Sequence, residues 1–271
     1  MTTAYLHDNR GIGIRHHQLI LPSVVCSTHV ARRIANGLDA ITFAHQHGCG
    51  IIGGDVAGID DFFSQLAAHP NVSSVLVVGL GCETIQSQEL GAKLLETNNS
   101  TRYQIIQESG GVQGTVDSGI AAAKQLNADF PKNQVEVKND QITVGIDNSN
   151  TKVVIIELTN ALKAAGYKVE IVTDSHISID NFSKLMELKA QVIISFPDEN
   201  QPASGFPLIP VINIAGTGPL HQATSQDFDL ANTNSSQEIL DLLAKVIAGQ
   251  ETKAEKSSVG EIRAPRIVRS V

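Results

Sequence analysis

The feature that most constrains this chain is an alternation of short apolar runs with segments of helical periodicity, repeated along most of its length. Buried parallel strands read as continuous apolar runs, and helices place apolar residues three or four positions apart. Such alternation predicts an α/β fold with two Rossmann-like units, each a mainly parallel sheet flanked by helices. The apolar runs predict strands at 18–26, 40–44, 74–80, 103–107, 168–173, 191–196 and 210–214. The helical patterns lie at 28–36, 59–68, 115–126, 151–165 and 236–248.

A polar stretch at 127–141, which contains one proline, separates the two halves of the pattern. A length of 271 residues suits two domains of about 150 residues or fewer. We therefore expect an N-terminal α/β domain at 1–130, a C-terminal α/β domain at 140–250 and an aperiodic tail at 251–271.

The overall charge and composition narrow the class of partner. A net charge of −8, an absence of Trp and an aromatic content of 4% argue against a nucleic-acid partner. No apolar run reaches the roughly 20 residues that a bilayer requires, and no apolar segment of a secretory signal follows the N-terminus. We expect a cytoplasmic protein without membrane contact.

Each of the three cysteines comes shortly after an apolar run. Cys26, Cys49 and Cys82 follow the first, second and third predicted strands, and His45 precedes Cys49 in the sequence HQHGCG. Parallel strands present their carboxyl ends at one edge, where ligands gather in α/β folds. Thiolate and imidazole ligands suit iron or zinc, although the absence of a CxxC pair argues against a structural zinc site. The alternative is that the cysteines are small buried hydrophobic residues.

Positive charge is concentrated near the N-terminus, where four arginines face one acid within residues 1–33. A guanidinium group matches a carboxylate or phosphate, so Arg15 is a candidate anion ligand. The backbone near Ser27, at the predicted start of the helix 28–36, would add donors for the same anion. The alternative is that these arginines are ordinary surface residues.

Longer blocks of the sequence resemble a known family. RGIGIRHHQLILPSVVCSTHVARRIA, HQHGCG, HPNVSSVLVVGLGCETIQ and IIQESGG follow one another within residues 9–115. Their order and spacing resemble the altronate/galactarate dehydratase family of sugar-acid hydro-lyases. A second stretch, which begins PLIPVINIAGTGPLHQ, resembles the end of the catalytic region of the same family.

The resemblance implies a function and a set of site residues. Family members remove water from hexonate or hexarate acids to give 2-keto-3-deoxy acids, with a divalent metal that is usually iron. Whether a single ion or a cluster would bind is left open. The roles implied for this sequence are catalytic for His45, Glu83 and Glu108, substrate-binding for Arg15, His16, Ser27 and Gln107, and metal-binding for Cys26, Cys49 and Cys82.

The sequence also departs from the family pattern. His16 stands where members commonly have Asn, and IDNSNT at 146–151 replaces an ECGGSD-like block. SFPDENQ at 195–201 replaces a TTGRG-like block, which removes its arginine. The main hypothesis is a metal-assisted hydro-lyase with a small-molecule sugar acid as substrate. The alternative is a catalytically inactive homologue that binds an anion or acts as a regulatory subunit. A homo-oligomer and a separate chain that carries the lid domain are both open as partners.

Overall fold

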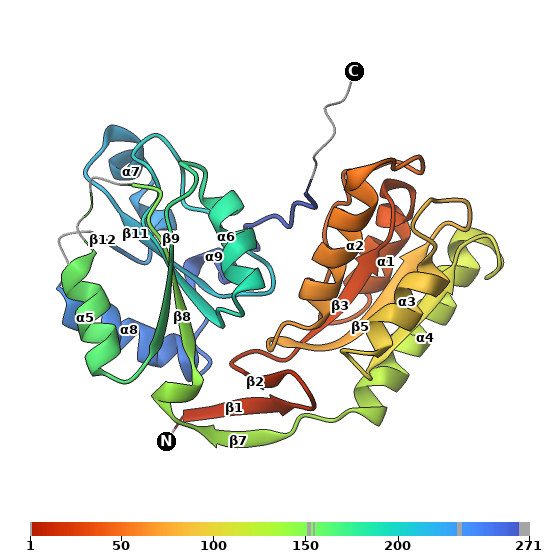
Figure 1. Cartoon of the computed structure of the whole chain (residues 1–271), viewed down its shortest axis with the longest axis horizontal. Coiled ribbons are helices and arrows are strands. Elements are labelled where there is room, and N and C mark those ends of the chain that lie inside the picture. Colours follow the sequence, from red (N-terminus) through yellow and green to blue (C-terminus); the bar gives the residue numbers. More distant parts are fainter. Residues whose placement is uncertain (1, 151–152, 154, 232–234, 266–271) are drawn as a thin grey trace. The chain divides into compact units, whose positions relative to one another are not determined.

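The computed structural model describes residues 2–150, 153, 155–231 and 235–265 of the chain (Figure 1). It forms two compact units. The C-terminal unit comprises the described residues of Met1–Tyr5, Ile12–Arg15 and Gln134–Glu261. The N-terminal unit comprises those of Leu6–Gly11, His16–Asn133 and Ile262–Val271.

The N-terminal unit contains a four-stranded sheet in the order β4-β3-β5-β6, and every neighbouring pair in it is parallel. Helices α1 and α4 contact each other and form a buried apolar layer on one face, and α2 and α3 contact β5 and each other. The elements are β3 (His17–Pro22), η1 (Val25–Ser27), α1 (Thr28–Asn36), β4 (Ala40–Ile41), α2 (Gly54–Ala67), β5 (Val72–Gly79), α3 (Ser87–Leu95), β6 (Thr101–Ile105) and α4 (Gly111–Asp129).

The C-terminal unit contains a parallel sheet in the order β12-β11-β10-β8-β9, with a small sheet of order β2-β1-β7. Helices α5 and α8 pack on one face of the five-stranded sheet, and α6 contacts β8, β9 and β10. The first elements are β1 (Thr2–His7), β2 (Gly11–Gly13), β7 (Gln134–Val137), η2 (Asn139–Gln141), β8 (Thr143–Asp147), α5 (Ile156–Ala164), β9 (Lys168–Val172) and α6 (Ser178–Glu187). The remainder are β10 (Val192–Ser195), β11 (Val211–Ala215), α7 (Pro219–Ala223), η3 (Ser225–Asp227), β12 (Leu230–Ala231), α8 (Ser236–Ile247) and α9 (Lys253–Lys256).

Local sequence explains the main elements. All eight residues of β5 are buried, as expected for a central parallel strand that is covered on both faces. Helix α1 buries Val30, Ala31 and Ile34 on one side and leaves Arg32 exposed on the other, so its apolar stripe faces the sheet. The prediction of an α/β fold with parallel sheets flanked by helices is confirmed.

Both parallel sheets have a topological switch point, where successive strands are added on opposite sides of the first strand. In the N-terminal unit β4 lies on one side of β3 and β5 on the other. In the C-terminal unit β9 lies on one side of β8 and β10 on the other. The crevice at the carboxyl end of such a pair of strands is the usual ligand position in α/β proteins.

Several predicted boundaries were wrong. The strand expected at 18–26 ends at Pro22, because the chain turns into η1 before α1. The strand expected at 40–44 is reduced to the two residues of β4 at the sheet edge. Helix α2 begins at Gly54 rather than at Ile59, and Gly53 supplies the positive φ of 63° before it.

The predicted helix at 151–165 partly lies outside the described residues, and its described part begins at Ile156. The polar stretch at 127–141 contains the end of α4 and the strand β7, which pairs with β1. The segment expected to be a tail contains α9 and buries Ile262, of which 1% is exposed.

Candidate functional site

The candidate site is the edge at which the four parallel strands of the N-terminal unit end. Because β3, β4, β5 and β6 are parallel, the loops after them share one side of the sheet. We call loops 23–28, 42–53, 80–86 and 106–110 together the thiol edge. The first three of these loops carry Cys26, Cys49 and Cys82, the three cysteines that the sequence predicts at one side of this sheet.

Hydrogen bonds join the loops of the thiol edge. The Val25 N–H donates to the His47 carbonyl at 2.9 Å, and the His45 N–H donates to the Thr28 hydroxyl at 3.2 Å. On the other side, the N–H and the hydroxyl of Thr84 both donate to the Cys49 carbonyl, at 3.0 and 2.9 Å. The loop that carries Cys49 is therefore held between the loops that carry the other two cysteines.

The three cysteines are free thiols that lie near one another. The Sγ atoms of Cys26 and Cys49 are 3.7 Å apart. The pKa of Cys49 is raised, first through its hydrogen bond with Cys26 and further through Cys82, which is also near enough to interact with it. Cys26 and Cys82 are exposed and Cys49 is half-buried, so these thiols are not core residues.

Two buried histidines precede Cys49 in the same loop. Residues 43–48 alternate between buried and exposed, which turns His45 and His47 to the same inward side, and their exposed fractions are 2% and 7%. Burial, and then the charge of His47, lowers the pKa of His45 to about 4. The Nε2 atoms of both rings are buried and have no hydrogen-bond partner among the described residues. His47 was not among the predicted site residues, although the HQH spacing in an extended segment was a usable signal.

One hydrogen bond fixes the tautomer of His45. Its Nδ1 accepts from the His47 N–H at 3.0 Å, so in the neutral ring Nε2 carries the hydrogen. The buried Nε2–H is therefore a donor without an acceptor, and in this tautomer it has no lone pair for a metal ion. The arrangement suits a ligand oxygen, which would reach Nε2 after a movement of the loop that covers it.

Glu83 is buried, and donors occupy its carboxylate. Oε1 accepts from the Ser23 hydroxyl at 2.9 Å and from the Leu80 N–H at 3.0 Å, and Oε2 accepts from the Gly81 N–H at 2.6 Å. These bonds cross the switch point between β3 and β5 and hold the turn before Cys82. Glu83 is thus built to position this loop, and no proton transfer is assigned to it.

The remaining predicted residues of this edge have different surroundings. Gln107 and Glu108 are exposed in the loop after β6, and Gln107 packs against Gly81, where a Cβ would come within 2.7 Å of its Oε1. Ser27 is fully buried and donates its hydroxyl to the Val24 carbonyl at 2.9 Å. Of the two predicted acids, Glu108 is the exposed one.

Arg15 belongs to the C-terminal unit, and His16 lies at the opposite end of β3 from the thiol edge. Both precede β3, whereas Cys26 follows it, and six strand residues at about 3.3 Å each separate the two ends by roughly 20 Å. The guanidinium of Arg15 binds both carboxylate oxygens of Glu255, at 2.8 and 3.1 Å, and three backbone carbonyls. Its donors are already used, so a substrate anion would have to displace Glu255.

His16 belongs to a histidine pair at the amino end of the sheet. Its Nδ1 is 3.0 Å from Nε2 of His7, whose Nδ1 donates to the Pro70 carbonyl at 2.6 Å. Burial lowers the pKa of His7 to about 4, and burial followed by His7, Lys132 and Arg10 lowers the pKa of His16 to about 4. Both rings are neutral at neutral pH and hold the start of β3.

The resemblance implies an iron site, which would need metal-ligating side chains that converge at the thiol edge. Among the described residues, no group of three or more His, Cys, Asp or Glu side chains is arranged to hold a metal ion. Nδ1 of His45 is occupied by the His47 N–H, so in this tautomer the ring has no free lone pair for a metal ion. The described residues therefore do not fit a preformed metal site with three protein ligands.

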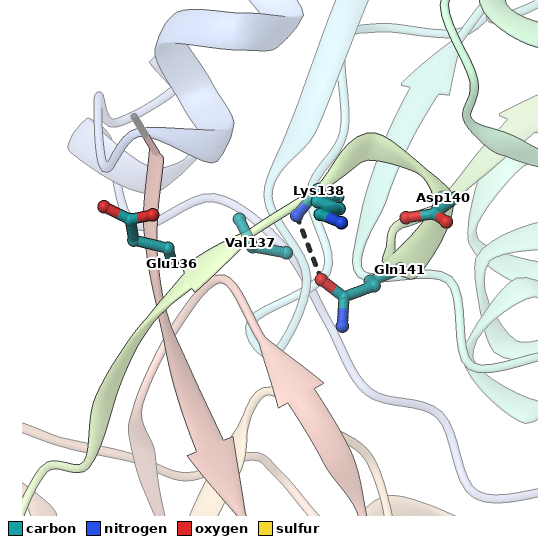
Figure 2. Close-up of a pocket in the computed structure, with 5 residues that line it drawn as sticks. All are labelled: Glu136, Val137, Lys138, Asp140 and Gln141. Carbon is teal, nitrogen blue, oxygen red and sulfur yellow. Dashed lines mark hydrogen bonds between the residues drawn. The ribbon is translucent and has the colours of Figure 1, made fainter.

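A pocket of about 560 Å³ lies elsewhere, in the C-terminal unit (Figure 2). Its lining comes from β7 and η2, and the Lys138 N–H donates to Oε1 of Gln141 at 3.0 Å. All of the lining side chains except the half-buried Val137 are exposed, and none is a predicted site residue. The lining residues are Glu136, Val137, Lys138, Asp140 and Gln141.

The C-terminal unit has a buried polar network at its own switch point. Asp147 ends β8 and accepts from the hydroxyls of Ser149 and Ser195, both at 2.6 Å, and from the Asn181 amide at 2.7 Å. Burial raises the pKa of Asp147, which these three donors partly oppose. This network occupies the crevice between β8 and β10 with protein groups.

Within the described residues, no helix is long and apolar enough to cross a membrane.

The part of the chain that forms the thiol edge is similar to known proteins. The model of "D-galactarate dehydratase/Altronate hydrolase, second domain" matches residues 4–130. Altronate dehydratase of Escherichia coli (strain K12) is 36% identical over 134 residues, which are 45% of this chain and 26% of that protein. Altronate dehydratase of Bacillus subtilis (strain 168) is 27% identical over 134 residues, again 45% of this chain and 27% of that protein. The matched part therefore spans about a quarter of either relative. Residues 4–130, somewhat less than half of the chain, are therefore similar to the second domain of the altronate/galactarate dehydratase family.

Proposed function

We propose that the protein is a carbohydrate-acid hydro-lyase, which removes water from a hexonate- or hexarate-type sugar acid to give a 2-keto-3-deoxy acid. The observation that carries the proposal is the match of residues 4–130 to the family, together with the polar thiol edge that these residues form. Both relatives are altronate dehydratases by name, which supports a sugar acid as substrate.

The reaction requires a base for the proton next to the substrate carboxylate and donors for the negative charge that develops there. Glu108 is our candidate base, because its carboxylate is exposed whereas that of Glu83 is occupied by three donors. The Nε2–H of His45 is our candidate donor to a carboxylate oxygen of the substrate. A neutral imidazole can serve as such a donor when its pKa is low.

Substrate contact with His45 requires movement of the loop at 42–53, because Nε2 is closed off from solvent. The loop favours such movement, since residues 42–48 form no regular secondary structure and Gly48 and Gly50 have open space around them. Gln107 would bind the substrate beside Gly81. The dependence on iron remains a prediction of the resemblance, and the roles proposed for Glu108, His45 and Gln107 do not require a metal ion.

The proposal is tested with the full chain, purified without oxygen and assayed with and without added Fe²⁺ against a panel of hexonates and hexarates. Formation of 2-keto acid is measured by semicarbazide absorbance, and bound iron is measured separately. Glu108→Gln should lower kcat by about 10²-fold or more, as expected when a general base is lost. The matched control Glu96→Gln, at an exposed position after α3, should not change kcat.

The absence of product from every acid in the panel would overturn the hydro-lyase proposal. The second candidate function is then an anion-binding or regulatory homologue, possible partners being a copy of this chain or a chain with a lid domain. It is favoured by the lack of a three-donor metal group among the described residues. Calorimetry with the same acids distinguishes the two, because the homologue binds an acid without converting it.

A further inference from the structure

We propose that Cys26 and Cys49 form a reversible disulfide that ties the loop after β3 to the loop after β4. This oxidative modification is independent of the proposed hydro-lyase activity. The observation that supports the disulfide is the 3.7 Å contact between the two Sγ atoms, each of which belongs to a free thiol in this structure.

The two loops can close the remaining distance. A disulfide bond is about 2.05 Å long, so the sulfur atoms must approach by roughly 1.7 Å. Cys49 lies between Gly48 and Gly50, and a Cβ built at either glycine meets no atom within 4 Å. This neighbourhood can shift without collision, while the bond from the Val25 N–H to the His47 carbonyl keeps the two loops together.

The order of reaction follows from exposure. Cys26 is exposed and Cys49 is half-buried, so a peroxide in solution reaches the Cys26 sulfur more readily. The Cys26 thiol loses its proton, and attack of the thiolate on the peroxide O–O bond gives a sulfenic acid and a hydroxide, which takes up that proton to leave as water. The Cys49 sulfur then attacks the sulfenic sulfur, which forms the disulfide and releases a second water. Overall, two thiols lose two protons and two electrons, and one peroxide is reduced to two waters.

Cys82 provides the internal control. It is exposed and also forms a hydrogen bond with Cys49, but it raises the pKa of Cys49 less than Cys26 does, whose sulfur lies 3.7 Å from that of Cys49. Thr84 holds the Cys49 carbonyl from the side of the Cys82 loop. If exposure alone decided the pairing, Cys82 would compete equally with Cys26 for Cys49. The 3.7 Å contact favours Cys26.

The experiment treats the dilute full chain with a small excess of hydrogen peroxide, blocks free thiols with N-ethylmaleimide and measures the intact mass. Wild-type protein should fall from three adducts to one, and dithiothreitol should restore all three. Trypsin leaves Cys26 on peptide 16–32 but leaves Cys49 and Cys82 together on peptide 34–93. A second cleavage before Asp55 separates these two cysteines, so the bridge can be assigned.

Three variants decide the result. Cys82→Ser should form the bridge as the wild type does, whereas Cys26→Ser and Cys49→Ser should each lose it. Retention of three free thiols, a bridge between Cys49 and Cys82, oxidation of single cysteines to sulfinic acid, or a bridge between two chains would each overturn the proposal. Because the readout is a thiol count, loss of hydro-lyase activity cannot imitate any of these outcomes.

Discussion

The two parallel sheets of this chain have switch points of the same kind but use them differently. At the carboxyl edge of its sheet, the N-terminal unit has half-buried or exposed thiols and two buried imidazole nitrogens that have no hydrogen-bond partner among the described residues. Between β8 and β10, the C-terminal unit has Asp147, whose oxygens accept from two hydroxyls and an amide. The comparison teaches that strand order provides a crevice, while the side chains decide whether it is available to a ligand.

The two units also use a buried carboxylate in different structural ways. Glu83 and Asp147 are both buried at a switch point, and each accepts three hydrogen bonds. Two of the donors to Glu83 are backbone N–H groups of the loop that leads to Cys82, so Glu83 shapes the thiol edge. All three donors to Asp147 are side chains, so Asp147 joins β8 to β10 and α6 directly.

The largest effect is expected from Asp147→Ala. The substitution removes the acceptor of the buried Ser149 and Ser195 hydroxyls and one of the acceptors of the Asn181 amide, and it should destabilise the C-terminal unit by about 3–5 kcal/mol. Hydrogen exchange should accelerate in peptides from β8 and β10 and stay unchanged in β3 and β5. Asp140→Ala, at an exposed position, is the control. Unchanged protection of β8 would show that the network contributes little.

A fall in pH should destabilise the N-terminal unit and stabilise the C-terminal unit. The pKa of His7 is about 4 in the folded state against 6.5 in the unfolded chain, so the unfolded state binds more protons between these values. Its contribution of roughly 3 kcal/mol is present above pH 6.5 and is lost as the pH falls toward 4. His16 contributes to the same pH dependence of stability, but its contribution is smaller because the side chain is partly exposed to solvent.

The raised pKa of Asp147 acts in the other direction. The folded C-terminal unit binds the proton more tightly, so protonation of Asp147 stabilises that unit as the pH falls through the raised value. Hydrogen exchange, corrected for intrinsic rates, should therefore show acid loosening β3 and β5 before β8 and β10. His7→Gln should weaken the acid response, and His176→Gln, an exposed control, should not. Parallel loosening of both units contradicts this prediction.

A glycine substitution at each switch point sharpens the comparison. A Cβ at Gly79 would lie 2.3 Å from Oγ of Ser87 and 2.4 Å from Oε1 of Glu83, so Gly79→Ala must displace the carboxylate that holds the loop. We expect a loss of about 2–3 kcal/mol. At Gly145 the nearest atoms are side-chain carbons at 3.0–3.1 Å, and we expect Gly145→Ala to cost about 1 kcal/mol. Thermal unfolding of both variants provides the measurement, and equal losses would refute the expected order.

Arg15→Gln is expected to have a smaller effect than Asp147→Ala, at the lower end of the range expected for Gly79→Ala. The substitution removes an ion pair with Glu255 in which the two side chains are 11% and 19% exposed, and the loss should be about 2 kcal/mol. Arg33→Gln, which removes one exposed hydrogen bond to Gln113, should cost about 0.5 kcal/mol or less. Urea unfolding measures both values. If Arg15→Gln left stability unchanged but weakened sugar-acid binding, the role first expected for this arginine would return.

The sequence identified the residues of the candidate site but not the hydrogen-bond partners of each residue. Strand periodicity placed the cysteines after three strands, and parallel pairing then brought their loops to one edge. No pattern indicated that Glu83 would be saturated with donors, because two of those donors are backbone groups of its own turn. Nor could spacing show that Arg15 would bind Glu255, which is 240 positions away.

What the sequence alone determined is the class of fold, the alternation of strands and helices, the similarity of residues 4–130 to a known family and the position of the thiols after strands. These follow from short-range periodicity and from contiguous motifs, which are properties of the chain itself. Only the tertiary structure decided which buried groups have partners, which tautomer His45 adopts and which thiols touch. These depend on atoms that meet across loops, and distances of a few tenths of an ångström there decide whether a hydrogen bond exists.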